Sequence, residues 1–154
     1  MDSLTIKKVT SMEKVFPMKE PSGEGMEDVL TGLRGETVSF QIAYFWDGFR
    51  KGRAQIQITS AIKDQVRVRS VELVPCEYPT HRETDEDYLT REPGLYPDLL
   101  CDIKPWGVDL VPGHWKSLWV DFDCDKNLQP HAAESSIMKF PICSVSGELP
   151  WLLR

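Results

Sequence analysis

Acidic residues near the centre of the chain could supply the paired carboxylates that hydrolysis of a glycosidic bond requires. Two pairs are close enough in sequence to be considered, Asp98 with Asp102 and Glu92 with Asp98. One carboxyl group of such a pair acts as an acid, and the other acts as a base or nucleophile or orients a substrate amide. Nothing in the sequence places either pair across a scissile bond. The favoured interpretation is that these carboxylates cap turns and pair with Arg91 or Lys104.

Aromatic residues in the same part of the chain could contact a sugar. Tyr88, Tyr96, Trp106 and Trp115 lie among many Pro and Gly residues, and an exposed aromatic ring can stack on the apolar face of a sugar ring. In the alternative interpretation Trp115 fills the core, while Tyr96 and Trp106 hold a loop in place. We favour this alternative because large aromatic side chains are mostly buried. Tyr88 and Trp106 are expected to be the most exposed of the four.

Residue spacing gives no support for a metal site, a cofactor site or a catalytic triad. The four cysteines form no CxxC pair, so they are interpreted as buried reduced thiols and not as zinc ligands. The three histidines lie in separate segments, with no Ser or Cys at a nucleophile elbow. The acidic run at residues 83–87 could bind calcium, but it lacks the glycine turn and distal glutamate of an EF-hand loop. We therefore expect no cofactor, no metal and no catalytic residue.

The overall composition indicates a single water-soluble domain. The chain has 154 residues, of which 41% are hydrophobic, and this is enough for one core. A formal charge of −6 argues against nucleic acid or an anionic membrane surface as the main partner. The first ten residues lack the apolar core of a secretory signal, and no apolar run is long enough to span a bilayer. These features predict a cytoplasmic protein.

Alternating apolar residues predict β-strands along most of the chain. The clearest run is residues 36–46, where five apolar residues share one parity: Val38, Phe40, Ile42, Tyr44 and Trp46. A short turn containing Gly48 separates it from residues 54–60, which suggests an antiparallel pair. Residues 4–16 suit an edge strand, and residues 29–30 could begin a short strand. In residues 66–75 the apolar parity switches near Arg69 and Ser70, which a bulge or a strand that changes sheets would explain.

Further strands are expected at residues 116–123 and 137–145, the second interrupted by Pro141. In the first of these Leu118, Val120 and Phe122 share one face, and Trp119 lies on the other. Both faces of that strand should therefore be at least partly covered. The apolar C-terminal residues 151–154 should pair or pack. Residues 91–113 contain seven Pro and Gly residues that break a ladder, and they predict a long ordered loop along one edge: Pro93, Gly94, Pro97, Pro105, Gly107, Pro112 and Gly113.

Four phrases of the sequence, in this order, resemble a known family: LRGETVSFQIAYFW (33–46), VRSVELVPCEYP (68–79), DEDYLTREPGLYPDLL (85–100) and VPGHWKSLWVDFD (111–123). They look like the N-terminal β-sandwich of bacterial proteins that carry the domain of unknown function numbered 4091. These proteins are similar to glycoside hydrolase family 123. The resemblance covers residues 4–123, and residues 136–154 fit the pattern less well. It implies a following (β/α) barrel, in which an acidic pair carries out substrate-assisted hydrolysis of N-acetylhexosamine linkages.

The residues and the resemblance together predict an all-β, two-sheet antiparallel β-sandwich, immunoglobulin-like or jelly-roll-like, over residues 1–154. Because the chain stops before any barrel, the expected role is that of a non-catalytic accessory domain. It would pack against a catalytic barrel domain or partner chain and shape its sugar site. The expected docking or sugar-contact surface comprises Tyr88, Glu92, Tyr96, Asp98 and Trp106. One alternative is an independent carbohydrate-binding module, and another is a small standalone hydrolase that uses Asp98.

Overall fold

A computed structural model describes residues 3–25, 29–59, 62–77, 90–124, 134–141 and 146–153. Their regular structure is β-strand apart from one short 3-10 helix, η1 (Lys63–Gln65), before β6. The strands in chain order are β1 (Leu4–Thr10), β2 (Val29–Leu30), β3 (Thr37–Trp46), β4 (Gly52–Ala54), β5 (Gln57–Thr59), β6 (Val66–Cys76), β7 (Gly94–Asp102), β8 (Val108–Leu110), β9 (Trp115–Asp123), β10 (Glu134–Pro141) and β11 (Ser146–Leu153). In this part of the chain no helix has the length and apolar character needed to cross a bilayer.

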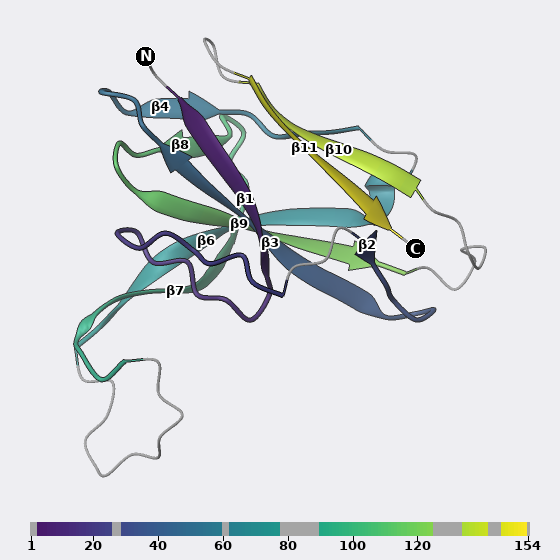
Figure 1. Ribbon diagram of the computed structural model, residues 1–154, viewed down its shortest axis with the longest axis horizontal. Coiled ribbons are helices and arrows are strands. Elements are labelled where there is room, and N and C mark those ends of the chain that lie inside the picture. The colour runs from purple at the N-terminus through teal and green to yellow at the C-terminus, as the bar shows by residue number, and fades with distance from the viewer. Residues whose placement is uncertain are drawn as a thin grey trace.

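The strands are arranged in two main sheets and one small ribbon (Figure 1). The first sheet has five antiparallel strands in the order β1-β3-β9-β6-β7. The second has the order β2-β11-β10-β5, and the ribbon pairs β4 with β8. This arrangement confirms the all-β sandwich predicted from the sequence. One pair departs from the antiparallel pattern, because β2 runs parallel to β11. The C-terminal strand β11 is thus paired on both sides, by β10 and by β2.

The main core lies between the two sheets and is built by strict alternation along β3 and β9. Phe40 lies opposite Val120, and Ile42 lies opposite Leu118, with each of these side chains at most 1% exposed. Leu30 of β2 and Ile58 of β5 pack against this cluster from the second sheet. The buried parity predicted for residues 36–46 and for residues 116–123 is therefore confirmed.

A second, smaller core covers the opposite face of the five-stranded sheet. It contains Val9, Val15, Ala43 and Trp115. Val15 belongs to residues 11–25, which we call the N-terminal strap because they cross this face between β1 and β2. The expectation that both faces of β9 are covered is confirmed.

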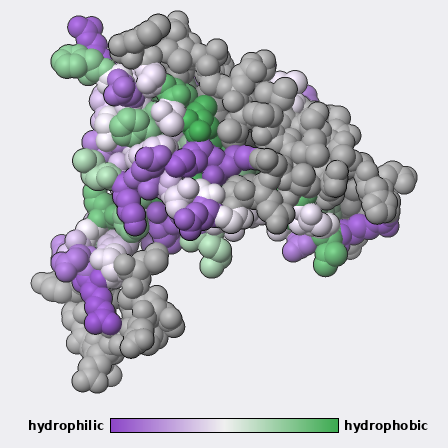
Figure 2. Space-filling model, in the orientation of Figure 1, coloured by the Kyte–Doolittle hydropathy of each residue, from purple (hydrophilic) through white to green (hydrophobic). Residues whose placement is uncertain are grey.

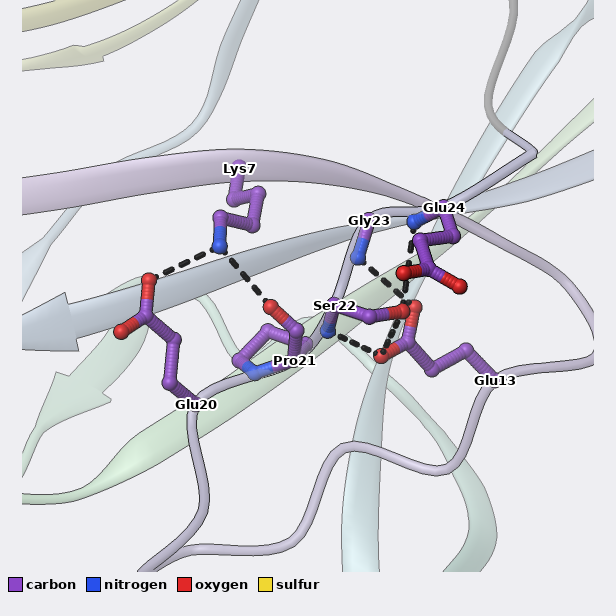
Figure 3. A network of polar contacts seen from close by, with 7 residues as sticks. All are labelled: Lys7, Glu13, Glu20, Pro21, Ser22, Gly23 and Glu24. Carbon is purple, nitrogen blue, oxygen red and sulfur yellow. Dashed lines mark hydrogen bonds and ion pairs between the residues drawn. The ribbon is translucent and has the colours of Figure 1, made fainter.

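Polar contacts fold the N-terminal strap onto itself (Figure 3). The Glu13 carboxylate accepts hydrogen bonds from the backbone N–H groups of Ser22 and Gly23, at 2.6 and 3.2 Å. Lys7 of β1 donates from Nζ to Glu20 at 2.8 Å. Because these bonds join the strap's two halves and tie it to β1, its path over the sheet is fixed.

Residues 91–113 do not form the long ordered loop that the sequence predicted. They contain β7, the edge strand next to β6, and β8 of the ribbon. Pro97 is tolerated in β7 because an edge strand needs ladder hydrogen bonds on only one side. The register shifts between Glu72 and Leu73 of β6, so Asp98 is an extra residue in β7 without a partner. Such a bulge is another place where a strand accommodates proline. The edge location was right, and the loop was wrong.

The predicted pairing of residues 36–46 with residues 54–60 is also wrong. Both sides of β3 are already paired, with β1 and with β9. The chain leaves the sheet after Trp46, and β4 and β5 pair with β8 and β10 instead. The parity switch near Arg69 and Ser70 does not interrupt β6. Apolar residues simply move from the face that meets the main core, at Val68, to the opposite face, at Val71.

Candidate functional site

Tyr96 and Glu92 are in contact at the start of β7. The Tyr96 hydroxyl donates a hydrogen bond to the backbone carbonyl of Glu92. The Tyr96 ring meets the Phe16 ring of the N-terminal strap edge to face, with 6.0 Å between centroids. Tyr96 thus holds the strap and the chain before β7 together, as the packing interpretation of this residue expected. Tyr88, the other tyrosine considered from the sequence, lies outside the described residues.

The acidic residues considered as catalytic pairs bind different cations. Asp98 forms an ion pair with Lys14 of the N-terminal strap. The Asp102 Oδ1 atom lies 3.2 Å from a guanidinium nitrogen of Arg67. Arg67 belongs to β6, the strand next to β7. The expected partners were Arg91 and Lys104, so the structural role was anticipated but the partners were not. Asp98 therefore links β7 to the N-terminal strap, and Asp102 links β7 to β6.

Trp106 lies at a turn between β7 and β8 and keeps 48% of its surface exposed. The turn is closed by a 2.8 Å hydrogen bond from the Gly107 N–H to the Lys104 carbonyl, and Pro105 occupies the position that proline favours in such turns. Two cations approach the ring, with Lys104 Nζ 5.5 Å and the Arg53 guanidinium carbon 5.8 Å from its centroid. These distances allow cation–π attraction. Trp106 is therefore both exposed and surrounded by positive charge.

Beside Trp106 is a hollow of about 250 Å³, which we call the Lys116 pocket. Its walls come from β6, β7, β8, β9 and the turn before β8. The side chains that give it its chemical character are Glu72, Lys104, Trp106, Asp109 and Lys116. Lys116 follows the buried alternation of β9 and lies opposite Tyr44 of β3. The pocket therefore begins where the apolar core between the sheets ends.

Ion pairs connect the charged groups around the Lys116 pocket. Lys116 Nζ lies 3.4 Å from a Glu72 oxygen. Asp109 is held by Lys51 at 3.3 Å and by Arg53 at 3.6 Å. Burial alone would raise the pKa of Asp109. The hydrogen bond from Lys51 and the charges of the nearby cations together lower it by more, so the pKa of Asp109 is below its ordinary value. Asp109 therefore remains a carboxylate at neutral pH.

Tyr44, a residue of the main core, lies next to these charged groups. Its hydroxyl lies 3.5 Å from the Asp109 carbonyl, and its side chain is 1% exposed. Burial, followed by the charges of Glu72 and Asp109, raises the pKa of Tyr44. It is therefore a neutral hydrogen-bond donor and not a base.

A second hollow, of about 290 Å³, has apolar walls and lies between the N-terminal strap and β6, β7 and β9. Its lining residues include Val15, Leu73, Pro97, Trp115 and His114. The His114 Nδ1 atom lies 2.7 Å from the Pro112 carbonyl. This hollow offers mainly apolar contact. Its polar lining residues are Glu72, His114, Lys116 and Ser117, and it shares Glu72 and Lys116 with the Lys116 pocket.

No group of three or more His, Cys, Asp or Glu side chains that could hold a metal is present among the residues that the structure describes. The acidic run at residues 83–87, considered for calcium, falls outside them. Of the five surface candidates, four lie in the described part of the chain, and of these Trp106 lines the Lys116 pocket, whereas Asp98 lies in a separate hollow with Lys14 and Trp119.

Sequence reasoning missed Glu72, Lys104, Asp109 and Lys116 as a set. They come from four separate segments, and β9 brings Lys116 beside β6 although 43 residues lie between Glu72 and Lys116. One signal was available, because Lys116 occupies a position of the buried parity of β9. A charged residue at a buried position usually has a partner or a function.

Comparison with known proteins identifies the fold. No family model and no curated protein matches the sequence. Among solved structures, the chain is similar to a family 123 glycoside hydrolase from Clostridium perfringens, studied for its hydrolysis of glycolipid glycans. The TM-score is 0.69 at 8% sequence identity, over 98% of this chain and 26% of that protein. At this identity the likeness shows a shared fold, and the chain spans about a quarter of the length of that hydrolase.

Proposed function

We propose that this chain is a non-catalytic accessory β-sandwich domain of a glycoside hydrolase-like protein, and that it packs against a (β/α) barrel and shapes the rim of its sugar site. The observation that carries the proposal is the match to one quarter of a larger glycoside hydrolase over nearly the whole of this chain. A quarter of that protein is the size of one compact domain, so the likeness concerns one domain of a larger enzyme. The sequence resemblance to proteins with domain 4091 supports the same role.

Exposed apolar residues on β6 and β7 supply a surface for this contact. Leu95 and Leu99 of β7 are 54% and 50% exposed, and Val74 of β6 is 37% exposed. Figure 2 shows apolar surface over β6 and β7, at the left of the view. Val74 and Leu99 lie on one face of the sheet, whereas Leu95 pairs with Pro75 and lies on the other face. We call Val74 and Leu99 the β7 patch. Because β7 is the edge strand of its sheet, a barrel that packs there would bury apolar area and also cover the open edge.

The arrangement of the carboxylates favours an accessory role over catalysis. Asp98 and Asp102 bind Lys14 and Arg67 and do not face each other across a hollow. Retaining and inverting glycosidases both need two carboxyl groups on opposite sides of one bond. The catalytic groups would accordingly belong to the barrel.

Hydrolysis of chromogenic N-acetylhexosaminides tests this division of labour. The 154-residue chain alone should give no turnover, whereas a (β/α) barrel polypeptide encoded with it should be active and should co-elute with the chain on size exclusion. Turnover by the chain alone that is lost in Asp98→Asn would show a standalone hydrolase instead. If the genome encodes no barrel fused to or beside this chain, the accessory role is refuted.

A further inference from the structure

We propose that the Lys116 pocket binds a single acidic sugar, a pyranose ring that carries a carboxylate. This inference goes beyond the accessory role, because it assigns the domain a ligand of its own. It stands on the charges, exposure and size of the pocket and not on the barrel.

Cations outnumber carboxylates around the Lys116 pocket, although the chain is negatively charged overall. The lining itself holds two lysines and two carboxylates, and the excess comes from Lys51 and Arg53, which contact Asp109 from outside the lining. Four cations line it or contact its lining residues, and two carboxylates oppose them: Lys51, Arg53, Lys104 and Lys116 against Glu72 and Asp109. The formal charge of the whole chain is −6. A local excess of cations around a hollow attracts an anion.

Lys116 and Lys104 have hydrogen-bonding capacity left for such an anion. The Lys116 side chain is 19% exposed, and its acceptor among the described residues is Glu72, at a long 3.4 Å. An ammonium group carries three donors, and a mostly buried one gains from a further acceptor. Lys104 lies over the Trp106 ring and has no acidic partner in the described part of the chain. A ligand carboxylate would fill the positions that both lysines leave open.

The remaining walls suit the hydroxylated ring of a sugar. Glu72 keeps 39% of its side chain exposed, so it can accept hydrogen bonds from ligand hydroxyl groups while it stays near Lys116. The half-exposed Trp106 offers apolar contact to the ring. The volume of about 250 Å³ lies below the usual range for drug-sized ligands, so one ring fits and an oligosaccharide would extend into solvent.

Other ligand classes leave part of this arrangement unused. A simple inorganic anion would contact the lysines but would give Trp106 and Glu72 no role. A neutral sugar would use Glu72 and Trp106 but would leave the two lysines without a new acceptor. A carboxylated sugar uses all four groups.

Titration of the 154-residue chain with D-glucuronate, D-glucose and sulfate, followed by the Trp106 indole N–H signal in NMR spectra, tests the proposal. D-glucuronate should shift this signal with roughly millimolar affinity, as expected for one ring. D-glucose should bind at least about tenfold more weakly, because it lacks the charge-assisted contacts. Equal binding of glucose, equal shifts with sulfate at the same ionic strength, or no binding of glucuronate would each overturn it.

Variants locate the site and control for charge. Lys116→Met should abolish glucuronate binding, and circular dichroism checks that it folds. Lys104→Gln and Trp106→Ala change exposed side chains, so both variants should fold. Each should weaken glucuronate binding at least about fivefold. Lys63→Gln, in the exposed helix η1, removes the same charge elsewhere and should leave binding unchanged. If Lys63→Gln weakens binding as much as Lys104→Gln, the effect is one of net charge and the pocket is not the site.

Discussion

Gly107, in the turn before β8, packs its backbone directly against the carbonyl oxygen of Ala54 in β4. A Cβ atom on Gly107 would overlap that oxygen, and φ at Gly107 is +89°. The contact locks the Trp106 turn onto the β4–β8 ribbon and so sets one wall of the Lys116 pocket.

Gly107→Ala is therefore expected to destabilise the domain strongly. Gly113 provides the matched control, since its φ is +68° but a Cβ there would meet no atom within 4 Å. Gly113→Ala should cost about 1–2 kcal/mol for the left-handed backbone alone. Gly107→Ala should cost about 1–3 kcal/mol more, because of the overlap. Urea unfolding of both variants measures the difference, and equal costs would show that the turn can move away from β4 freely.

The hydrogen bond between Ser117 and Gln41 is expected to hold the N-terminal strap on the sheet. Ser117 Oγ donates to Gln41 Oε1 at 3.0 Å, and Gln41 Nε2 donates to the carbonyls of Thr10 and Glu13 at 3.1 and 2.7 Å. Gln41→Leu leaves these buried partners without a hydrogen bond and should lower the unfolding free energy by about 2–4 kcal/mol.

Hydrogen exchange shows whether the strap is the part affected. Amides of residues 11–25 should lose protection in Gln41→Leu more than amides of β9 do. Ser117→Ala removes one of the three bonds and should have a smaller effect. A Gln41→Leu variant with unchanged strap protection would contradict this role.

Asp121 makes the stability of the domain sensitive to acid. Burial alone would raise the pKa of Asp121. The charge of Arg69 and the hydrogen bonds from Ser39, Trp119 and Arg69 together lower it by more, so the pKa of Asp121 lies below the ordinary 3.8. For a carboxyl group whose folded pKa is depressed, the stabilisation is fully present above the unfolded value and is lost as pH falls through the folded value. The loss from this group should therefore occur below about pH 4.

Asp121→Asn isolates this contribution. At pH 7 it should lower the unfolding free energy by about 2 kcal/mol, because Arg69 loses its charged partner. The difference between wild type and variant should shrink as the pH falls toward 2 in thermal unfolding measurements. The exposed pair of Arg67 and Asp102, with side chains 63% and 83% exposed, is the control. Asp102→Asn should change stability by less than about 1 kcal/mol.

The cysteines should differ in reactivity toward thiol reagents. Cys124 is 7% exposed, whereas Cys76 and Cys101 are partly exposed. Burial, followed by the charges of Glu36 and Asp123, raises the pKa of Cys124, and only the thiolate reacts readily. At pH 8 iodoacetamide should modify Cys76 and Cys101 at least about tenfold faster than Cys124, as followed by peptide mass spectrometry. In urea the three cysteines should react at similar rates, which provides the reference. Equal rates in the folded protein would contradict the buried position of Cys124.

The buried strands could be predicted from sequence because their signal is local. Alternation at Phe40 and Ile42 and at Leu118 and Val120 is a property of consecutive residues, and it marked β3, β9 and their buried faces correctly. Proline was misleading in β7, since Pro97 removes a donor whether it lies in a loop or at the bulged edge of a sheet. Only the pairing of β7 with β6 distinguishes the two, and that pairing depends on the whole sheet.

Strand partners and the Lys116 pocket were beyond local reasoning. Residues 54–60 follow β3 closely and alternate well, yet β3 is already paired on both sides, so the chain crosses to the other sheet. In the same way, Glu72 and Lys116 become neighbours only because β6 and β9 are adjacent. Trp106 was expected to be exposed because it lies among many Pro and Gly residues. The cations around it could not be predicted, because they come from β4 and from its own turn.

The affinity of the chain for its barrel partner, measured by calorimetry for variants of the β7 patch, tests the accessory role most directly. Leu99→Asp, which places a charge in the patch, should weaken binding at least about tenfold. Leu33→Asp changes a leucine that is 77% exposed and lies before β3, and it should leave the affinity within about twofold. Both variants must show wild-type circular dichroism. Loss of affinity in Leu99→Asp alone is the predicted result, and an affinity that neither variant changes would contradict docking through β7.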